Sequence, residues 1–184
     1  MVTNPKAMEL IKKGKREYDG FTLWPHYHKE KMNWAGGARV KGDVDIIVYA
    51  TTGRDPFEDA PCRTPDEERA GKGKVVGGIK EQTRQVLWDI KEHLEMMGGS
   101  LKDIFLFHYF LMRREDVFDM RDEMYRFFAE FEPDLREHPR MSVLLRGVGI
   151  DLPDMRVEME VWAAVPRRRS RRASPKASAK AKDM

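Results

Sequence analysis

The chain has 184 residues, a single cysteine (Cys62) and a formal net charge of +3. This length suits one domain with its own apolar core, and one cysteine excludes an intramolecular disulfide. No stretch approaches the roughly 20 apolar residues of a membrane span, and the N-terminus lacks the apolar run of a signal peptide. We therefore expect a soluble, cytoplasmic protein that has no membrane partner.

Residues 166–184 differ from the rest of the chain in charge. They hold eight of the 34 basic residues and one of the 31 acidic residues, which leaves 26 basic and 30 acidic residues in 1–165. Their composition offers nothing that could build a core, so we predict a disordered basic tail. Such a tail is either simply solvated or attracts nucleic acid by counterion release, and nucleic acid is expected only through this segment.

The first part of the chain predicts an extension, two strands and a long loop. Residues 1–35 are rich in aromatic side chains but follow no regular pattern, so we expect an irregular N-terminal extension. Strands are predicted at 38–41 and 45–51, the second of which is β-branched and largely apolar. Residues 53–78 hold many charges, glycines and prolines, and they predict a long loop inserted into the domain.

Two amphipathic helices follow, with a strand between them. Apolar residues at helical spacing predict a helix over 79–97, which Gly98 ends. A second helix is predicted from about 115 to 131, ending before Pro133. The nearly continuous apolar run 104–112 is typical of a central strand.

The last two strands, predicted at 142–147 and 155–165, complete the order β-β-α-β-α-β-β over residues 36–165. This order predicts an α+β domain in which both helices cover one face of a mixed sheet. The last strand alternates: Val157, Met159 and Val161 share one face, and the other face carries Arg156, Glu158, Glu160 and Trp162. Two carboxylates and a tryptophan on one strand face suggest a subunit interface that holds a polar site.

Six segments between Trp34 and Pro166 resemble, in order, the signatures of the reactive intermediate deaminase family (Rid, also called YjgF-like or RidA-type). They are Ala50–Gly53 (ATTG), Gly78–Leu87 (GIKEQTRQVL), Glu92–Ile104 (EHLEMMGGSLKDI), Tyr125–Phe128 (YRFF), Pro139–Val143 (PRMSV) and Val157–Ala163 (VEMEVWA).

The resemblance implies a fold, an assembly and an activity. The fold is a chorismate-mutase-like, ferredoxin-type sheet, and three copies form a homotrimer around a central barrel with clefts between the subunits. The activity is hydrolysis of enamines and imines to keto compounds and ammonia, without a cofactor. Substrates would be small anions of the 2-aminoacrylate or 2-imino acid type, or of the 2-aminomuconate type known from aromatic catabolism.

The resemblance also implies site residues. Arg140 would grip the substrate carboxylate, Glu158 would position water, and Thr52 would supply a hydroxyl. Gly53 and Ser142 would line the substrate site. A family tyrosine falls near Trp34, which lacks the hydroxyl, and the segment after Arg140 departs from the family pattern.

The chemistry of these residue types leaves alternatives open. A guanidinium binds carboxylates in a bidentate manner, and the place of Arg140 after Pro139 and just before a strand favours this role over the alternatives, a structural salt bridge or a solvated arginine. Glu158 could act as a general base or form an ion pair at an interface. Thr52 could bind substrate or cap a turn.

Other polar residues give weaker signals. His26 and His28 have a spacing that suits zinc but have no further ligands nearby in the sequence, and we expect no metal. Cys62 lies in a polar loop without an activating partner. His108 in an apolar strand is more typical of a core histidine than of a catalyst. The glycines at 71 and 73 lack the spacing of a phosphate-binding loop.

The sequence therefore supports an enamine or imine deaminase as the leading hypothesis. The competing hypothesis is a non-catalytic Rid-like protein that binds a small ligand, acts as a chaperone or associates with nucleic acid through the tail.

Overall fold

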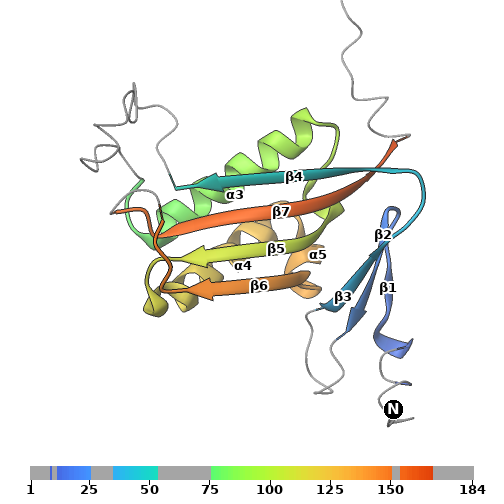
Figure 1. Ribbon diagram of the computed structural model, residues 1–184, viewed down its shortest axis with the longest axis horizontal. Coiled ribbons are helices and arrows are strands. Elements are labelled where there is room, and N and C mark those ends of the chain that lie inside the picture. Colours follow the sequence, from blue (N-terminus) through green and yellow to red (C-terminus); the bar gives the residue numbers. More distant parts are fainter. Residues whose placement is uncertain (1–8, 10–11, 26–34, 54–75, 151–153, 168–184) are drawn as a thin grey trace, which may run out of the picture.

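The computed structural model describes residues 9, 12–25, 35–53, 76–150 and 154–167. Trp34, Cys62, both histidines of the 26–28 pair, most of the 53–78 segment and nearly all of the basic tail lie outside the described residues. Two sheets and the helices that pack on the larger one make up the fold (Figure 1). The elements are β1 (Arg16–Glu17), β2 (Phe21–Pro25), β3 (Ala35–Val40), β4 (Val44–Thr52), α3 (Ile79–Met96), η1 (Leu101–Asp103), β5 (Ile104–Leu111), η2 (Arg114–Asp116), α4 (Val117–Phe131), α5 (Pro133–Glu137), β6 (Met141–Arg146) and β7 (Val157–Pro166).

The larger sheet has four strands in the order β4-β7-β5-β6. β7 runs antiparallel to both of its neighbours, and β5 and β6 are parallel. A parallel pair needs a crossover connection, which α4 and α5 supply. The helices lie on one face of this sheet (Figure 1), so the predicted α+β class with a mixed sheet is confirmed.

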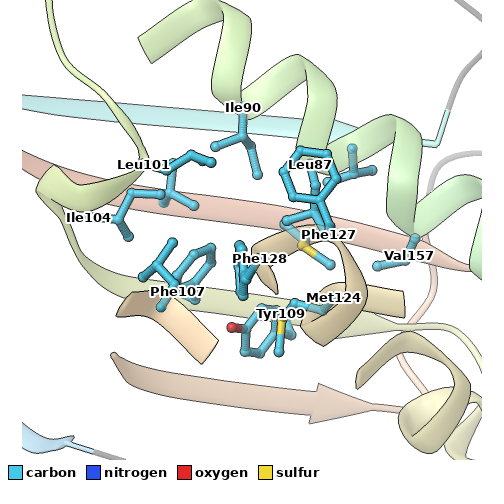
Figure 2. Close-up of a cluster of buried hydrophobic side chains, with 14 of the residues drawn as sticks. Leu87, Ile90, Leu101, Ile104, Phe107, Tyr109, Met124, Phe127, Phe128 and Val157 are labelled. Atoms are coloured by element: carbon cyan, nitrogen blue, oxygen red, sulfur yellow. The ribbon is translucent and has the colours of Figure 1, made fainter. Parts of the chain in front are cut away.

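The apolar core lies between this sheet and the helices, as Figure 2 shows. Every second residue of β7 from Val157 to Val165 is completely buried, whereas Glu158, Glu160 and Trp162 on the other face are not. The alternation predicted from the sequence of the last strand is therefore confirmed. The helices contribute Leu87, Ile90, Met124, Phe127 and Phe128 to the core.

The first helix begins where the sequence predicts and ends one residue earlier than predicted. Its first turn is closed by Glu81, whose side chain accepts a hydrogen bond from the Gly78 amide at 2.9 Å. It ends at Met96, and Gly98 follows with φ of 83°, a conformation that favours glycine.

The second helix, α4, ends at Phe131 as predicted, but the segments on either side of it differ from the prediction. A 3-10 turn at Arg114–Asp116 precedes α4, and a separate short helix, α5, begins at Pro133. The prediction took Pro133 only as a stop signal. Proline also favours the first turn of a new helix, because it needs no amide donor there, and α5 uses it in this way.

The N-terminal region contains a second sheet that the sequence analysis missed. β1, β2 and β3 form a three-stranded antiparallel sheet, so the expectation of an irregular segment is wrong for residues 16–25. The predicted strand at 38–41 belongs to β3, which pairs with β2 rather than with the larger sheet. β2 has five residues and ends in proline, which leaves little alternation for a sequence pattern to detect.

The small sheet packs against the larger one near the start of β6 (Figure 1). Phe21 and Leu23 form an apolar cluster with Phe105 and Ala164. At Gly20 the two units come so close that an added Cβ would lie 2.4 Å from the Ala164 carbonyl oxygen, which excludes any side chain there.

Candidate functional site

Arg140 lies just before β6 and is one of few buried charged residues among those described, with a relative exposure of 3%. Its guanidinium donates hydrogen bonds to three backbone carbonyl oxygens: Nε to Ile104 at 2.9 Å, Nη1 to His138 at 2.9 Å and Nη2 to Lys102 at 3.4 Å. These acceptors belong to η1, to the first residue of β5 and to the residue after α5. The backbone therefore fixes the plane of the guanidinium.

Two side chains complete the contacts of Arg140. Nη1 donates to the Tyr18 hydroxyl at 2.8 Å, and Nη2 donates to Oδ2 of Asp134 at 2.8 Å. The Tyr18 hydroxyl in turn donates to the same Asp134 oxygen at 3.0 Å. Among the readings that the sequence left open for Arg140, the solvated arginine is wrong and a salt bridge is present.

Aromatic rings from the N-terminal sheet enclose the guanidinium. Its central carbon lies 4.4 Å from the centroid of the Tyr18 ring and 5.8 Å from that of Phe21, and these rings stack on each other. Burial raises the pKa of Tyr18, so its hydroxyl keeps its proton at neutral pH and remains a donor to Asp134.

A cavity of about 250 Å³ borders Arg140 on the helix side of the sheet. It lies between β5, β6, α4 and α5, and its wall is largely aromatic and apolar. The polar groups on the wall are Ser142, Tyr109, Tyr125, Arg121 and Arg140. The structure therefore brings two of the predicted substrate-binding residues, Arg140 and Ser142, to one cavity.

The other predicted residues meet at the far end of the sheet. Thr52 and Glu158 are directly opposite each other in the register between β4 and β7, and Phe110 is the β5 partner of Glu158. Opposite residues of an antiparallel pair have Cβ atoms roughly 5 Å apart, so a threonine hydroxyl and a carboxylate share this point.

Gly53 follows Thr52 and packs against the side chain of Gln82. An added Cβ would lie 2.6 Å from Cβ of Gln82, so residue 53 must be glycine for α3 to pack here. Gln82 is completely buried, accepts a hydrogen bond from the Arg156 amide and donates to the Asp154 carbonyl oxygen. This amide side chain fixes the start of β7, and with it Glu158, relative to α3.

Arg140 and Glu158 of one chain lie far apart. Arg140 precedes the residue that pairs with Leu106, whereas Glu158 pairs with Phe110. At the usual strand rise, this register separates them by roughly 16 Å along the strands, and two strand spacings add about 10 Å across the sheet. The two side chains of a single copy cannot hold the same three-carbon molecule.

The sheet face away from the helices carries a polar centre within an apolar surface. Oε1 of Glu160 lies 2.7 Å from both Nδ1 of His108 and Nε1 of Trp162. His108 therefore has a partner but lies on this open face rather than in the core. Around these residues, large apolar side chains are 36–48% exposed: Ile46, Val48, Val143, Leu145 and Trp162.

The sequence did not reveal two residues that contact Arg140, Tyr18 and Asp134. Neither forms part of a recognisable motif, because Tyr18 contacts Arg140 across 122 positions of the chain. Among the described residues there is no cluster of three or more metal-ligating side chains, and no helix long and apolar enough to cross a membrane.

Comparison with known families decides the identity of the domain. Residues 62–165, more than half of the chain, match the family described as endoribonuclease L-PSP. The chain belongs to this family. It is the Rid family, so the resemblance that the sequence segments carry is confirmed.

Two relatives illustrate the relationship. The RutC family protein PH0854 from Pyrococcus horikoshii is 40% identical over 62 residues, which are 33% of this chain and 49% of that protein. The match thus spans about half the length of that relative. A solved structure from the conserved Rid protein family of Yersinia pestis has a TM-score of 0.52 at 16% identity, over 72% of this chain and 87% of that one, and it supports the fold alone.

Proposed function

We propose that this Rid-family chain hydrolyses small anionic enamines and imines to keto acids and ammonia, as a cytoplasmic homotrimer that needs no cofactor. The observation that carries the proposal is the cavity of about 250 Å³ whose wall includes Arg140 and Ser142. Arg121 and Arg140 line this cavity together with Ser142 and several aromatic and apolar side chains, and such a wall suits a planar, unsaturated carboxylic acid.

A second copy of the chain is part of the proposal because Glu158 and Thr52 lie too far from Arg140 of their own chain. The open face of the sheet exposes apolar side chains on β4, β6 and β7, and burial against other copies would remove these from water. A trimer of this kind would bring the Glu158 end of one sheet towards the Arg140 end of the next. The threefold arrangement follows from the family resemblance.

In the proposed reaction, Arg140 holds the carboxylate of the 2-imino acid. Glu158 accepts a proton from a water molecule whose oxygen bonds to the imine carbon, and it passes this proton to the nitrogen as the carbon–nitrogen double bond becomes a single bond. In the resulting amino alcohol, Glu158 takes the hydroxyl proton and passes it to the nitrogen; the carbon–oxygen double bond forms, the carbon–nitrogen bond breaks, and a keto acid and ammonia remain. The Thr52 hydroxyl donates a hydrogen bond beside Glu158, and an enamine first tautomerises to the imine.

The substrate size follows from the same cavity. A volume of about 250 Å³ is more room than a 2-aminoacrylate-type acid needs. The proposal therefore includes larger acids of the 2-aminomuconate type, which would connect the protein with aromatic catabolism. Trp34 and residues 54–75 lie outside the described residues.

A non-catalytic, ligand-binding Rid protein is the second candidate, and one observation favours it. Arg140 has no exposed side-chain surface and all its donors are engaged, as in a structural anchor.

Ammonia release separates the two candidates. The assay uses 2-imino acids generated in the cuvette by an amino acid oxidase, together with 2-aminomuconate. We expect faster ammonia release with wild type than without protein, and a loss of about 30-fold or more in kcat/KM for Arg140→Ala. Arg136→Ala is the matched control, because Arg136 is exposed on α5. Ammonia release at the uncatalysed rate for every substrate would leave the ligand-binding candidate.

A further inference from the structure

The guanidinium of Arg140 already holds a carboxylate. Asp134 binds Nη2 at 2.8 Å and receives a second hydrogen bond from the Tyr18 hydroxyl at 3.0 Å. A carboxylate held by an arginine nitrogen and a tyrosine hydroxyl has the contacts that a bound carboxylic acid would make. In this state no N–H of Arg140 is left for a substrate.

The five hydrogen bonds of Arg140 fall into two groups. Three go to backbone carbonyl oxygens, which hold the arginine in place. The other two go to the side chains of Tyr18 and Asp134, which are both partly exposed; the side chain of Asp134 is 36% exposed, whereas that of Arg140 is 0% exposed. Asp134 therefore covers the guanidinium on a side that water reaches, and rotation of one side chain in the five-residue helix α5 would uncover it.

We propose that Asp134 is an internal substitute for the substrate carboxylate: it occupies Arg140 in the free protein, and a substrate binds by taking its place. This inference rests on the proposed function, in which Arg140 is the carboxylate-binding residue. Tyr18 keeps the same role in both states, because its hydroxyl accepts from Nη1 and can donate to whichever carboxylate lies on Nη2.

The exchange has a consequence for specificity. A buried guanidinium without an anion is strongly unfavourable, whereas replacement of one carboxylate by another keeps the charge neutralised. A neutral amide or alcohol cannot compete with Asp134, so the arrangement selects carboxylates. It also lowers the apparent affinity, because only the fraction of molecules with Asp134 displaced can bind.

The test is calorimetric titration with 2-oxobutanoate, a stable product-like 2-oxo acid. Asp134→Asn keeps the shape and an acceptor oxygen but removes the charge that competes with the ligand. We expect Asp134→Asn to bind 2-oxobutanoate about tenfold more tightly than wild type. Asp122→Asn, an exposed position on α4, makes the same change in net charge and should bind as wild type does. Equal or weaker binding by Asp134→Asn, or equal tightening by Asp122→Asn, would overturn the proposal.

Two further measurements keep the test decisive. If Asp134→Asn does not fold, a structure of wild type with 2-oxobutanoate decides, because Asp134 must have left Nη2; a ligand bound while Asp134 remains there refutes the exchange. Binding without any ammonia release from imino acids would remove the proposed deaminase activity and leave the exchange intact. Ammonia release together with unchanged affinity in Asp134→Asn would refute the exchange and leave the proposed deaminase activity intact.

Discussion

Replacement of Arg140 by alanine should destabilise the fold as well as affect the site. The side chain is completely buried and donates five hydrogen bonds, which connect the N-terminal sheet, the turn before β5 and α5. Its loss leaves three backbone carbonyl oxygens without this donor and removes the stacking surface of Tyr18.

The expected magnitude follows from these contacts. Removal of one partner from a buried ion pair typically costs about 3–5 kcal/mol, and the partial exposure of Asp134 favours the lower half of this range. For a protein of this size the loss corresponds to a decrease in Tm of about 6–16 °C. Arg140→Lys should recover little, because an ammonium group cannot reach the same five acceptors.

Thermal unfolding monitored by circular dichroism measures this effect. Arg136→Ala serves as the control and should stay within about 0.5 kcal/mol of wild type, because that side chain is exposed. An Arg140→Ala protein that unfolds at the wild-type temperature would refute the anchoring role. Kinetic comparison of this variant must use temperatures well below its own Tm.

Three further predictions concern the proposed site, the assembly and pH. Glu158→Gln keeps the shape but removes the base, so kcat should fall much more than KM changes in the ammonia assay; an unchanged kcat would exclude Glu158 from proton transfer. Light scattering should give about three times the 21.5 kDa chain mass. Val48→Lys should shift the protein to smaller species, because it places a charge on the exposed apolar face. A wild-type monomer at micromolar concentration would contradict the proposal that other copies cover this face. Burial raises the pKa of Asp89, so the folded state favours the protonated form, and ionisation of Asp89 lowers the free energy of unfolding as pH rises through that pKa. The free energy of unfolding of Asp89→Asn, measured by denaturant relative to wild type, should therefore be higher at pH 7 than at pH 4. The same difference between variant and wild type at both pH values would contradict this.

The larger sheet and its helices could be predicted because their signals are local. The helical spacing of Val86, Leu87 and Ile90 and the alternation of β7 each place apolar side chains towards one core. The β1–β2 hairpin carries no comparable pattern, because β1 has two residues and β2 has five. Its apolar residues are specified by packing against Phe105 and Ala164, which the sequence does not place beside them.

The candidate site could be predicted only in part. The motif around Arg140 identified the arginine, and the cavity beside it also includes Ser142. The sequence could not reveal that Asp134 and Tyr18 bind the arginine, since both depend on how α5 and the hairpin pack. The distance between Arg140 and Glu158 likewise follows from strand order, because β7 lies between β4 and β5 rather than beside β6.

The contact between Tyr18 and Arg140 also affects how the chain folds during synthesis. The two residues are 122 positions apart, so at 5–20 residues per second the ribosome needs roughly 6–24 s to deliver the arginine after the tyrosine. Phe21 and Leu23 lack the complete surface that later buries them until Ala164 has been made, because Phe105 and Ala164 both come after them in the sequence. This hairpin is thus made before the rest of the described fold but is among the last elements to become native, and its apolar residues must be kept from aggregation until β7 has been made.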